Sequence, residues 1–294
     1  MKIGIYGQFY HEDSEKYIQP ILDALKDDKA DIYIESNFLE IIIQQIGISN
    51  TFSSLKTFNK LDSSFDLFFS IGGDGTILKS VTFVGDLGIP IVGINTGRLG
   101  FLATIQKENV AESIHNILEG NYSISERTLL SVETKPEYSE LNPLNFALNE
   151  IAVNRKNTTS MIKVETEVNG EFLNSYWSDG LIISTPTGST GYSLSCGGPV
   201  IDPGANSMVI TPIAPHNLNA RPLVIPDICT INLRVSGREE SYLISLDSRI
   251  ATLKNDTLVT IKKSPFTIKL VQLKKDSFIK TLRKKLLWGE DKRN

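Results

Sequence analysis

The chain has 294 residues, of which 40% are hydrophobic and 22% are charged, as in an ordinary globular protein of about two domains. Its formal net charge is −4 at pH 7, which argues against a main partner that is a nucleic acid, because phosphate binding needs a clustered positive surface. Two cysteines, Cys196 and Cys229, are too few for a disulfide framework. Without a signal-peptide core or a membrane-length apolar run, the sequence favours a cytoplasmic protein with no membrane partner.

The first 120 residues alternate between strand-like and helix-like segments. The predicted strands are 2–7, 31–35, 66–71 and 89–95, and the predicted helices are 15–25, 38–46, 76–84 and 109–118. This order predicts an α/β domain with a parallel sheet and helices on its faces. Pro20 leaves the start of the first helix open.

After residue 120 the segments become short and strand-like. The predicted strands are 128–134, 146–153, 162–168, 183–185, 229–235 and 241–246, and Asn169-Gly170 is a strong hairpin signal. We therefore expect a β-rich, mostly antiparallel second domain. A last helix from Ser277 carries Lys280, Arg283, Lys284 and Lys285 between apolar residues, which predicts a docked amphipathic helix with a solvated basic face.

A glycine-rich loop follows the predicted strand 66–71. Its residues are Gly72, Gly73, Asp74, Gly75 and Thr76. Ligands bind beyond the carboxyl ends of strands in open α/β sheets, and glycines let backbone N–H groups approach a phosphate. A tight Asp-Gly turn leading into a helix capped by Thr76 is an equally good interpretation of the loop alone. No Walker A, dinucleotide-fold or protein-kinase signature accompanies it.

Two further segments offer many small polar groups. Asp179 precedes an apolar strand, after which hydroxyl-bearing residues and glycines continue from Thr185 to Ser195. These groups supply hydrogen-bond donors and acceptors with little bulk, as a base and a ribose require, although a hydroxyl-rich loop of a β domain is the alternative. The dipeptide Asn149-Glu150 suits the vicinal hydroxyls of a ribose but is not specific by itself.

Taken together, these segments resemble the NAD kinase family. The resemblance rests on residues 72–76, 95–102, 149–150, 178–199 and 215–222, which occur in the family's order and span most of the chain. The glycine loop alone is shared more widely, with diacylglycerol and sphingosine kinases and, more loosely, with 6-phosphofructokinases.

The resemblance implies a two-domain architecture and an activity. The expected parts are an α/β domain (1–120), a β-rich NAD-binding domain (121–276) and a C-terminal helix that packs back on the body (277–294). The expected reaction moves the γ-phosphoryl group of ATP to the 2′-hydroxyl of the adenosine ribose of NAD, giving NADP and ADP. A divalent cation, with Mg²⁺ as the expected ion, and a homo-oligomer, a tetramer or a dimer, are also implied.

Residue by residue, the resemblance assigns Asp74 as the catalytic carboxylate, either as a proton acceptor or as a group that positions the metal and the hydroxyl. It places Gly72, Gly73, Gly75, Thr76 and Lys79 around the phosphates. Asn149 and Glu150 hold the adenosine ribose, Asp179 the nicotinamide half, and Phe101 covers the adenine edge. The adenine and its surroundings are assigned to Thr187, Thr190, Gly191, Tyr192, Ser193, Leu194 and Ser195.

Some positions depart from the family pattern. Asp247 matches an acidic position near the active site, but Ser248 follows it where we expect glycine. Gly191 stands where many relatives carry alanine. Cys196 stands where a small residue is usual, and without a base nearby in the sequence its expected role is packing.

Two other functions stay open at this level. A lipid kinase built on the same glycine loop would leave residues 178–199 unexplained, and no amphipathic or basic segment flanks the motifs. A non-catalytic NAD-binding sensor would not need Asp74. Formation of NADP from NAD and ATP distinguishes the three.

Overall fold

The computed structural model describes residues 1–8, 18–27, 30–46, 55–97, 99–103, 105–157, 160–274 and 277–288. The chain forms two compact units, and unit 2 (residues 127–267) is inserted into the sequence of unit 1 (residues 1–126 and 268–294). Strands β7 (Tyr122–Lys135) and β18 (Leu258–Leu273) contribute residues to both units. The divisions expected at residues 121 and 277 therefore differ from the units, because the end of β18 pairs within unit 1.

Unit 1 is built on a parallel sheet, as predicted. Its strand order is β5-β4-β1-β2-β3, β6 pairs with β5, and Leu270 near the end of β18 lies beside Ile91 of β5. The strands are β1 (Lys2–Gly7), β2 (Asp31–Glu35), β3 (Lys56–Phe58), β4 (Leu67–Gly72), β5 (Ile91–Asn95) and β6 (Ile105–Gln106). Every residue of β4 and β5 is buried, which is typical of central parallel strands covered on both faces.

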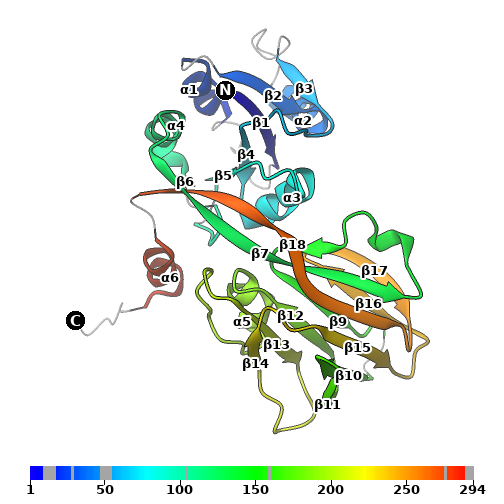
Figure 1. Cartoon of the computed structure of the whole chain (residues 1–294). Coiled ribbons are helices and arrows are strands. Elements are labelled where there is room, and N and C mark those ends of the chain that lie inside the picture. The colour runs from blue at the N-terminus through cyan, green and yellow to red at the C-terminus, as the bar shows by residue number, and fades with distance from the viewer. Residues whose placement is uncertain are drawn as a thin grey trace. The chain divides into compact units, whose positions relative to one another are not determined.

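The helices of unit 1 lie close to their predicted positions. They are α1 (Ile18–Asp27), α2 (Ser36–Ile46), α3 (Asp74–Val84), α4 (Val110–Leu118) and α6 (Phe278–Leu286), with one turn of 3₁₀ helix at Lys107–Asn109. Residues 15–17 of the first predicted helix lie outside the described residues. Strand β4 is followed directly by helix α3 (Figure 1). Gly73 alone separates the two elements, and this connection holds the predicted glycine loop.

Helix α6 is amphipathic, but its apolar side is not fully covered. The Ser277 hydroxyl caps it by accepting a hydrogen bond from Lys280 N (3.2 Å), and Leu282 is buried. The four basic residues are exposed, as predicted. Ile279 and Trp288, which we expected on the docked face, are 58% and 52% exposed.

Unit 2 consists of antiparallel strands in two groups. One group has the order β11-β10-β15-β18, with β7 pairing with β18 and β8, and the other has the order β14-β13-β12-β9-β16-β17. The strands are β8 (Phe146–Ala147), β9 (Glu150–Asn154), β10 (Ile162–Val168), β11 (Glu171–Ser178), β12 (Gly180–Ser184), β13 (Ser207–Ile213), β14 (Leu223–Pro226), β15 (Ile231–Ser236), β16 (Ser241–Leu246) and β17 (Arg249–Lys254). Short helical turns are Ser139–Leu141, Gly188–Thr190 and α5 (Tyr192–Ser195).

The strands of both groups share one hydrophobic core. Ile151 of β9 and Leu181 of β12 belong to the same buried cluster as Val164 of β10 and Val259 of β18. β10 alternates between buried and more exposed residues, as a strand with one face buried does, whereas β9 and β12 are buried along nearly their whole length. The β-rich second unit therefore agrees with the sequence prediction.

Two local predictions had different outcomes. The Asn169-Gly170 turn joins β10 to β11, and both residues have positive φ (53° and 81°), as a two-residue hairpin turn requires. The stretch 146–153, expected as one strand, is broken at residues 148 and 149. The break arises because the N–H groups there bind a carboxylate instead of a neighbouring strand.

Candidate active site

The glycine loop forms the junction of a buried strand and a helix. Strand β4 ends at Gly72, Gly73 is the N-cap residue, and Asp74 begins α3. A Cβ atom at Gly72 would lie 2.2 Å from Thr76 Oγ1, so this glycine permits the tight packing of the loop. Cβ atoms at Gly73 and Gly75 would meet nothing within 4 Å. Both glycines thus leave open space beside the first N–H groups of α3, where an anion is stabilised.

The Asp74 carboxylate binds a second loop of unit 1, residues 101–103, at the start of α3. Its Oδ2 accepts a hydrogen bond from Phe101 N (2.8 Å), and its Oδ1 accepts bonds from Leu102 N and Ala103 N (both 3.0 Å). A Cβ atom at Gly100 would lie 1.9 Å from Asp74 Oδ1, so glycine is required there. A carboxylate offers about four acceptor positions, and these three bonds leave one, on Oδ2.

Three other predicted residues of unit 1 lie around this junction. Thr76 is fully buried, and its hydroxyl has no hydrogen-bond partner among the described residues. Lys79 is exposed and lies four residues after Gly75, on the same face of α3. The Phe101 ring contacts Phe278 (6.4 Å between ring centroids), and Lys285 Nζ lies 5.7 Å from its centre. Helix α6 therefore packs against the loop that Asp74 holds.

In unit 2 a second carboxylate holds the Asn149-Glu150 dipeptide. Asp247 accepts hydrogen bonds from Leu148 N (2.9 Å), Asn149 N (2.8 Å) and Glu150 N (3.1 Å), and its own N–H donates to Glu150 O (3.0 Å). Asp247 occupies the two-residue turn between β16 and β17 with φ of 53°. Ser248 is not among the described residues with positive φ, so the turn does not require the glycine that we expected there.

The two side chains of the dipeptide present unsatisfied acceptors. Asn149 Oδ1 and Glu150 Oε2 are buried without a hydrogen-bond partner in the described part of the chain. Burial raises the pKa of Glu150 to about 8, the negative charge of Asp247 adds to this rise, and the backbone N–H of Tyr192 opposes it. Buried polar atoms without partners are rare, and a ligand with hydroxyl donors would satisfy these two.

The hydroxyl-rich segment, residues 185–195, packs directly on the dipeptide. Thr185 N donates to Asn149 O (2.9 Å) and Thr185 Oγ1 donates to Leu148 O (2.6 Å). A Cβ atom at Gly188 would lie 2.1 Å from Asn149 O, and one at Gly191 would lie 3.4 Å from Glu150 Oε2. The structure therefore brings Gly191 next to Asn149 and Glu150, although about forty residues separate it from this dipeptide in the sequence.

The remaining residues of this segment divide into buried and accessible ones. Thr187 and Ser193 are buried, and the Ser193 hydroxyl is occupied by Thr211 Oγ1 (2.8 Å). Thr190 Oγ1 donates to Thr187 O (3.2 Å), which makes this turn compact. Those that reach the surface at least in part are Thr190, Tyr192, Leu194 and Ser195. A ligand can reach these four side chains, whereas Ser193 serves the packing of the segment.

Asp179 is paired with a cation that the sequence analysis did not include. Arg155 Nε lies 3.0 Å from Asp179 Oδ1, and Arg155 Nη2 donates to Asp179 Oδ2 (3.2 Å). The pairing follows from strand register, because Asn154 of β9 lies opposite Gly180 of β12 and the next pair outward is Arg155 and Asp179. No local sequence signal shows this, since it depends on which strands are neighbours.

Two other groups were considered as site components. Burial raises the pKa of the partly exposed Cys196 thiol, which makes it a poor nucleophile. The described residues contain no group of three His, Cys, Asp or Glu side chains that could hold a metal ion.

None of the described helices is long and apolar enough to span a membrane.

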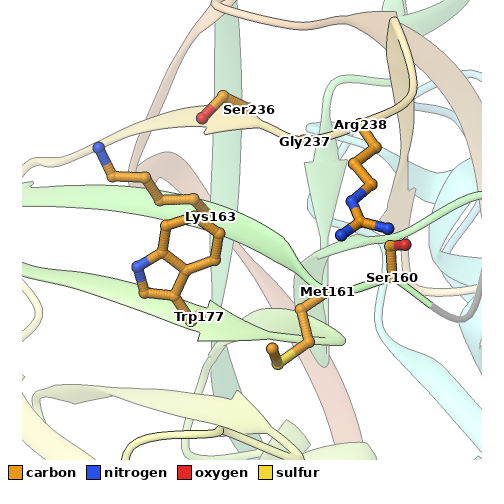
Figure 2. Close-up of a pocket in the computed structure, with 7 residues that line it drawn as sticks. All are labelled: Ser160, Met161, Lys163, Trp177, Ser236, Gly237 and Arg238. Carbon is orange, nitrogen blue, oxygen red and sulfur yellow. The ribbon is translucent and has the colours of Figure 1, made fainter.

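A separate pocket of about 550 Å³ lies on the solvent-facing side of β10, β11 and β15. Figure 2 shows Lys163 beside Trp177, and Arg238 pointing toward Ser160 and Met161. None of the predicted site residues lines this pocket. It is therefore distinct from the dipeptide and the hydroxyl-rich segment.

Comparisons with known proteins cover nearly the whole chain. The family described as the ATP-NAD kinase N-terminal domain matches residues 3–122, and that described as the ATP-NAD kinase C-terminal domain matches residues 148–273. NAD kinases from Christiangramia forsetii, Flavobacterium psychrophilum and Bacteroides fragilis (strain YCH46) are 60%, 57% and 40% identical, and each alignment covers 100% of both chains.

Two solved structures share the fold. Yeast NADH kinase complexed with NADH superimposes with a TM-score of 0.84 at 21% identity, covering 99% of this chain and 88% of that one. An NAD kinase from Archaeoglobus fulgidus in complex with ATP gives a TM-score of 0.74 at 26% identity, covering 98% and 99%.

We expect Gly100→Ala to destabilise the protein by ~1–3 kcal/mol, because its Cβ atom would overlap the Asp74 carboxylate. Gly75→Ala is the matched control, since its Cβ atom would enter open space. Differential scanning calorimetry should show a lower thermal midpoint for Gly100→Ala only. Equal midpoints for the two variants would contradict the described contact.

The stability of the ligand-free protein should depend on Glu150 ionisation. The pKa of Glu150 is raised from 4.5 to about 8 by folding, so the folded state binds its proton more tightly. The stabilising contribution is full below about pH 4.5 and is lost as the pH rises through about 8, with a size on the order of 2–4 kcal/mol. Glu150→Gln should remove this component from urea unfolding measured between pH 5 and pH 9. Identical pH profiles for the two proteins would show that Glu150 ionises normally.

Proposed function

We propose how the residues of this chain, which belongs to the NAD kinase family, transfer the γ-phosphoryl group of ATP to the 2′-hydroxyl of the adenosine ribose of NAD. The products are NADP and ADP. Phosphoryl transfer requires positioning and charge stabilisation more than covalent help from the protein. We assign a role to each side chain from the hydrogen-bond donors and acceptors that its contacts within the protein leave unused.

Asn149 and Glu150 bind the adenosine ribose in this proposal. The observation that carries the assignment is the pair of buried acceptors, Asn149 Oδ1 and Glu150 Oε2, without partners among the described residues. Ribose hydroxyls donate the hydrogen bonds that these oxygens lack. Gly191 lies beside both side chains and adds no bulk, so the space next to them stays open.

Asp74 directs the acceptor hydroxyl. Three of its acceptor positions hold the backbone of residues 101–103, and the fourth, on Oδ2, is available to the 2′-hydroxyl. We assign this hydrogen bond as the one that aligns the nucleophilic oxygen with the phosphorus atom. The same bond gives the hydroxyl proton a place to go when the new P–O bond forms.

The glycine loop and Lys79 receive the phosphates of ATP. Gly73 and Gly75 leave space beside the N–H groups at the start of α3, while Gly72 and Thr76 shape the loop from within. The exposed Lys79 lies on the face of α3 that carries Gly75. Its ammonium group compensates charge on the transferred phosphoryl group.

The outer parts of NAD are assigned to the accessible side chains. We place the adenine and its surroundings near Thr190, Tyr192, Leu194 and Ser195, with the buried Thr187 behind them and Phe101 at the adenine edge. Ser193 acts through packing, because Thr211 occupies its hydroxyl. Asp179 is assigned to the nicotinamide half.

A divalent cation, Mg²⁺, accompanies ATP in this proposal. The described residues contain no group of three His, Cys, Asp or Glu side chains suited to a metal ion, so we assign the ion to the phosphates of ATP. Mg²⁺ retains several waters and is commonly bound through substrate phosphates, which fits such a surface. We therefore derive no step from protein ligands to the metal.

We also propose that the enzyme forms a homo-oligomer, a dimer or a tetramer, in the cytoplasm. The support is the apolar surface of unit 2, where Phe172, Leu218 and Ile228 are 62%, 86% and 84% exposed, and an interface between subunits would cover these side chains if they form one patch. The two cysteines are free, as in a reducing compartment. Neither a nucleic acid nor a membrane is a required partner.

The identity of the phosphorylated hydroxyl is tested by locating the phosphate in the product. Phosphorus NMR should show a 2′-phosphate on the adenosine ribose, and 2′-deoxy-NAD should not be phosphorylated. A 3′-phosphate would contradict the role given to Asn149 and Glu150. Diacylglycerol and sphingosine in micelles serve as the alternative acceptors, and labelled lipid without NADP would favour a lipid kinase.

Asp74→Asn should lower kcat at least ~100-fold, because an amide keeps the size of the side chain but removes its charge and an acceptor. The affinity for NAD, measured by calorimetry, should change little. Asp62→Asn is the matched control, since the exposed Asp62 carboxylate contacts Ser64 and Lys2 among the described residues and lies outside the assigned site. The thermal midpoint of Asp74→Asn must be preserved for the comparison. A wild-type kcat with a raised KM for NAD would make Asp74 a binding residue.

A further inference from the structure

The Arg155–Asp179 pair is the best-defined ion pair near the residues assigned to NAD. Two nitrogens of the guanidinium meet the two carboxylate oxygens at 3.0 and 3.2 Å, and Arg155 N donates to Asp179 O (3.0 Å). The two side chains are only 31% and 33% exposed. A two-point contact of this kind fixes both the direction and the net charge of the carboxylate.

Tyr192 links Asp179 to the ribose-binding residues, although Asp179 and Glu150 lie at opposite ends of the β9–β12 pair. Burial raises the pKa of Tyr192, and the charges of Cys196, Asp179 and Glu150 raise it further, so both carboxyl groups lie near enough to this phenol to act on it. Tyr192 follows Gly191, which lies beside Glu150. The ion pair therefore belongs to the environment in which NAD is placed by the proposed function.

The two forms of the dinucleotide differ in charge at one ring. The nicotinamide ring of NAD carries a positive charge, whereas the dihydronicotinamide ring of NADH is neutral. An unpaired carboxylate beside this ring would attract the cation and would give no such attraction to the neutral ring. A carboxylate paired in two places with a guanidinium has almost no net charge to contribute.

We propose that Arg155 sets the preference between NAD and NADH by neutralising Asp179. The pair keeps the Asp179 oxygens available to hydrogen bond the carboxamide or the ribose, but it weakens the selection for the charged ring. The chain thereby accepts NADH with an efficiency comparable to that for NAD. This inference rests on the assignment of Asp179 to the nicotinamide half.

The test compares kcat/KM for NAD and for NADH in the same protein at low ionic strength. Arg155→Met keeps much of the side-chain length and removes the charge, so the NAD to NADH ratio should rise ~10-fold. Arg155→Lys loses the two-point contact but keeps the positive charge beside Asp179, so it should leave the ratio within about twofold of wild type. The increase in Arg155→Met should shrink at high salt, where exposed charges are screened. A purely structural defect would lower both efficiencies together and would leave the ratio unchanged.

Two further variants separate the possible failures. Arg234→Met removes an exposed arginine of β15 that bonds a distant carbonyl, and it should change neither efficiency. Asp179→Asn in the Arg155→Met protein should return the ratio to the wild-type value. If Asp179→Asn alone changes neither KM, Asp179 does not contact the nicotinamide half, and both the assignment and the inference fail. If Asp179→Asn raises the KM for NAD but Arg155→Met leaves the ratio unchanged, only the inference is overturned.

Discussion

The functional residues of this protein depend on carboxylates that each bind three consecutive backbone N–H groups. Asp74 holds residues 101–103, and Asp247 holds residues 148–150. These N–H groups lie outside regular strand pairing, and charge-assisted hydrogen bonds supply the partners that a strand would have provided. The irregular backbone at Asn149 is therefore ordered, although it belongs to no strand.

The carboxyl groups of Asp247 and Glu150 differ in the hydrogen bonds that they receive from the backbone. Asp247 is surrounded by N–H donors, whereas Glu150 is buried beside that charge, which raises the pKa of Glu150 to about 8. Two carboxyl groups so close together favour a single negative charge. Burial raises the pKa of Asp247 as well, but three N–H bonds and the charge of Arg249 oppose that rise, whereas at Glu150 the backbone N–H of Tyr192 is the opposing group. With a pKa of about 8, Glu150 favours its protonated form near neutral pH. A protonated carboxyl can donate as well as accept, which suits a ribose hydroxyl.

The sequence patterns predicted those features that depend on residues close together in the chain. The bounds of β1, β2 and β16, the Asn169-Gly170 turn and the position of the glycine loop all follow from periodicity and turn chemistry. The contacts of Asp74 and Asp247 join residues that are 27–29 and 97–99 positions apart. Arg155 was missed because its partner is fixed by the pairing of β9 with β12. Such contacts require knowledge of neighbouring strands, which a single sequence does not contain.

The insertion of unit 2 within unit 1 has a consequence for how the chain folds as it is synthesised. The ribosome releases residues 1–126 first, and β6 then covers the β5 edge at Ile94 and Asn95, whereas the part of this edge at Ile91 waits for Leu270. All of unit 2 must emerge before that part is covered, and an open strand edge can pair with another chain. Phe101 likewise lacks its ring contact until Phe278 has been synthesised. A nascent chain stopped before residue 268 would thus carry a complete unit 2 and an unfinished unit 1.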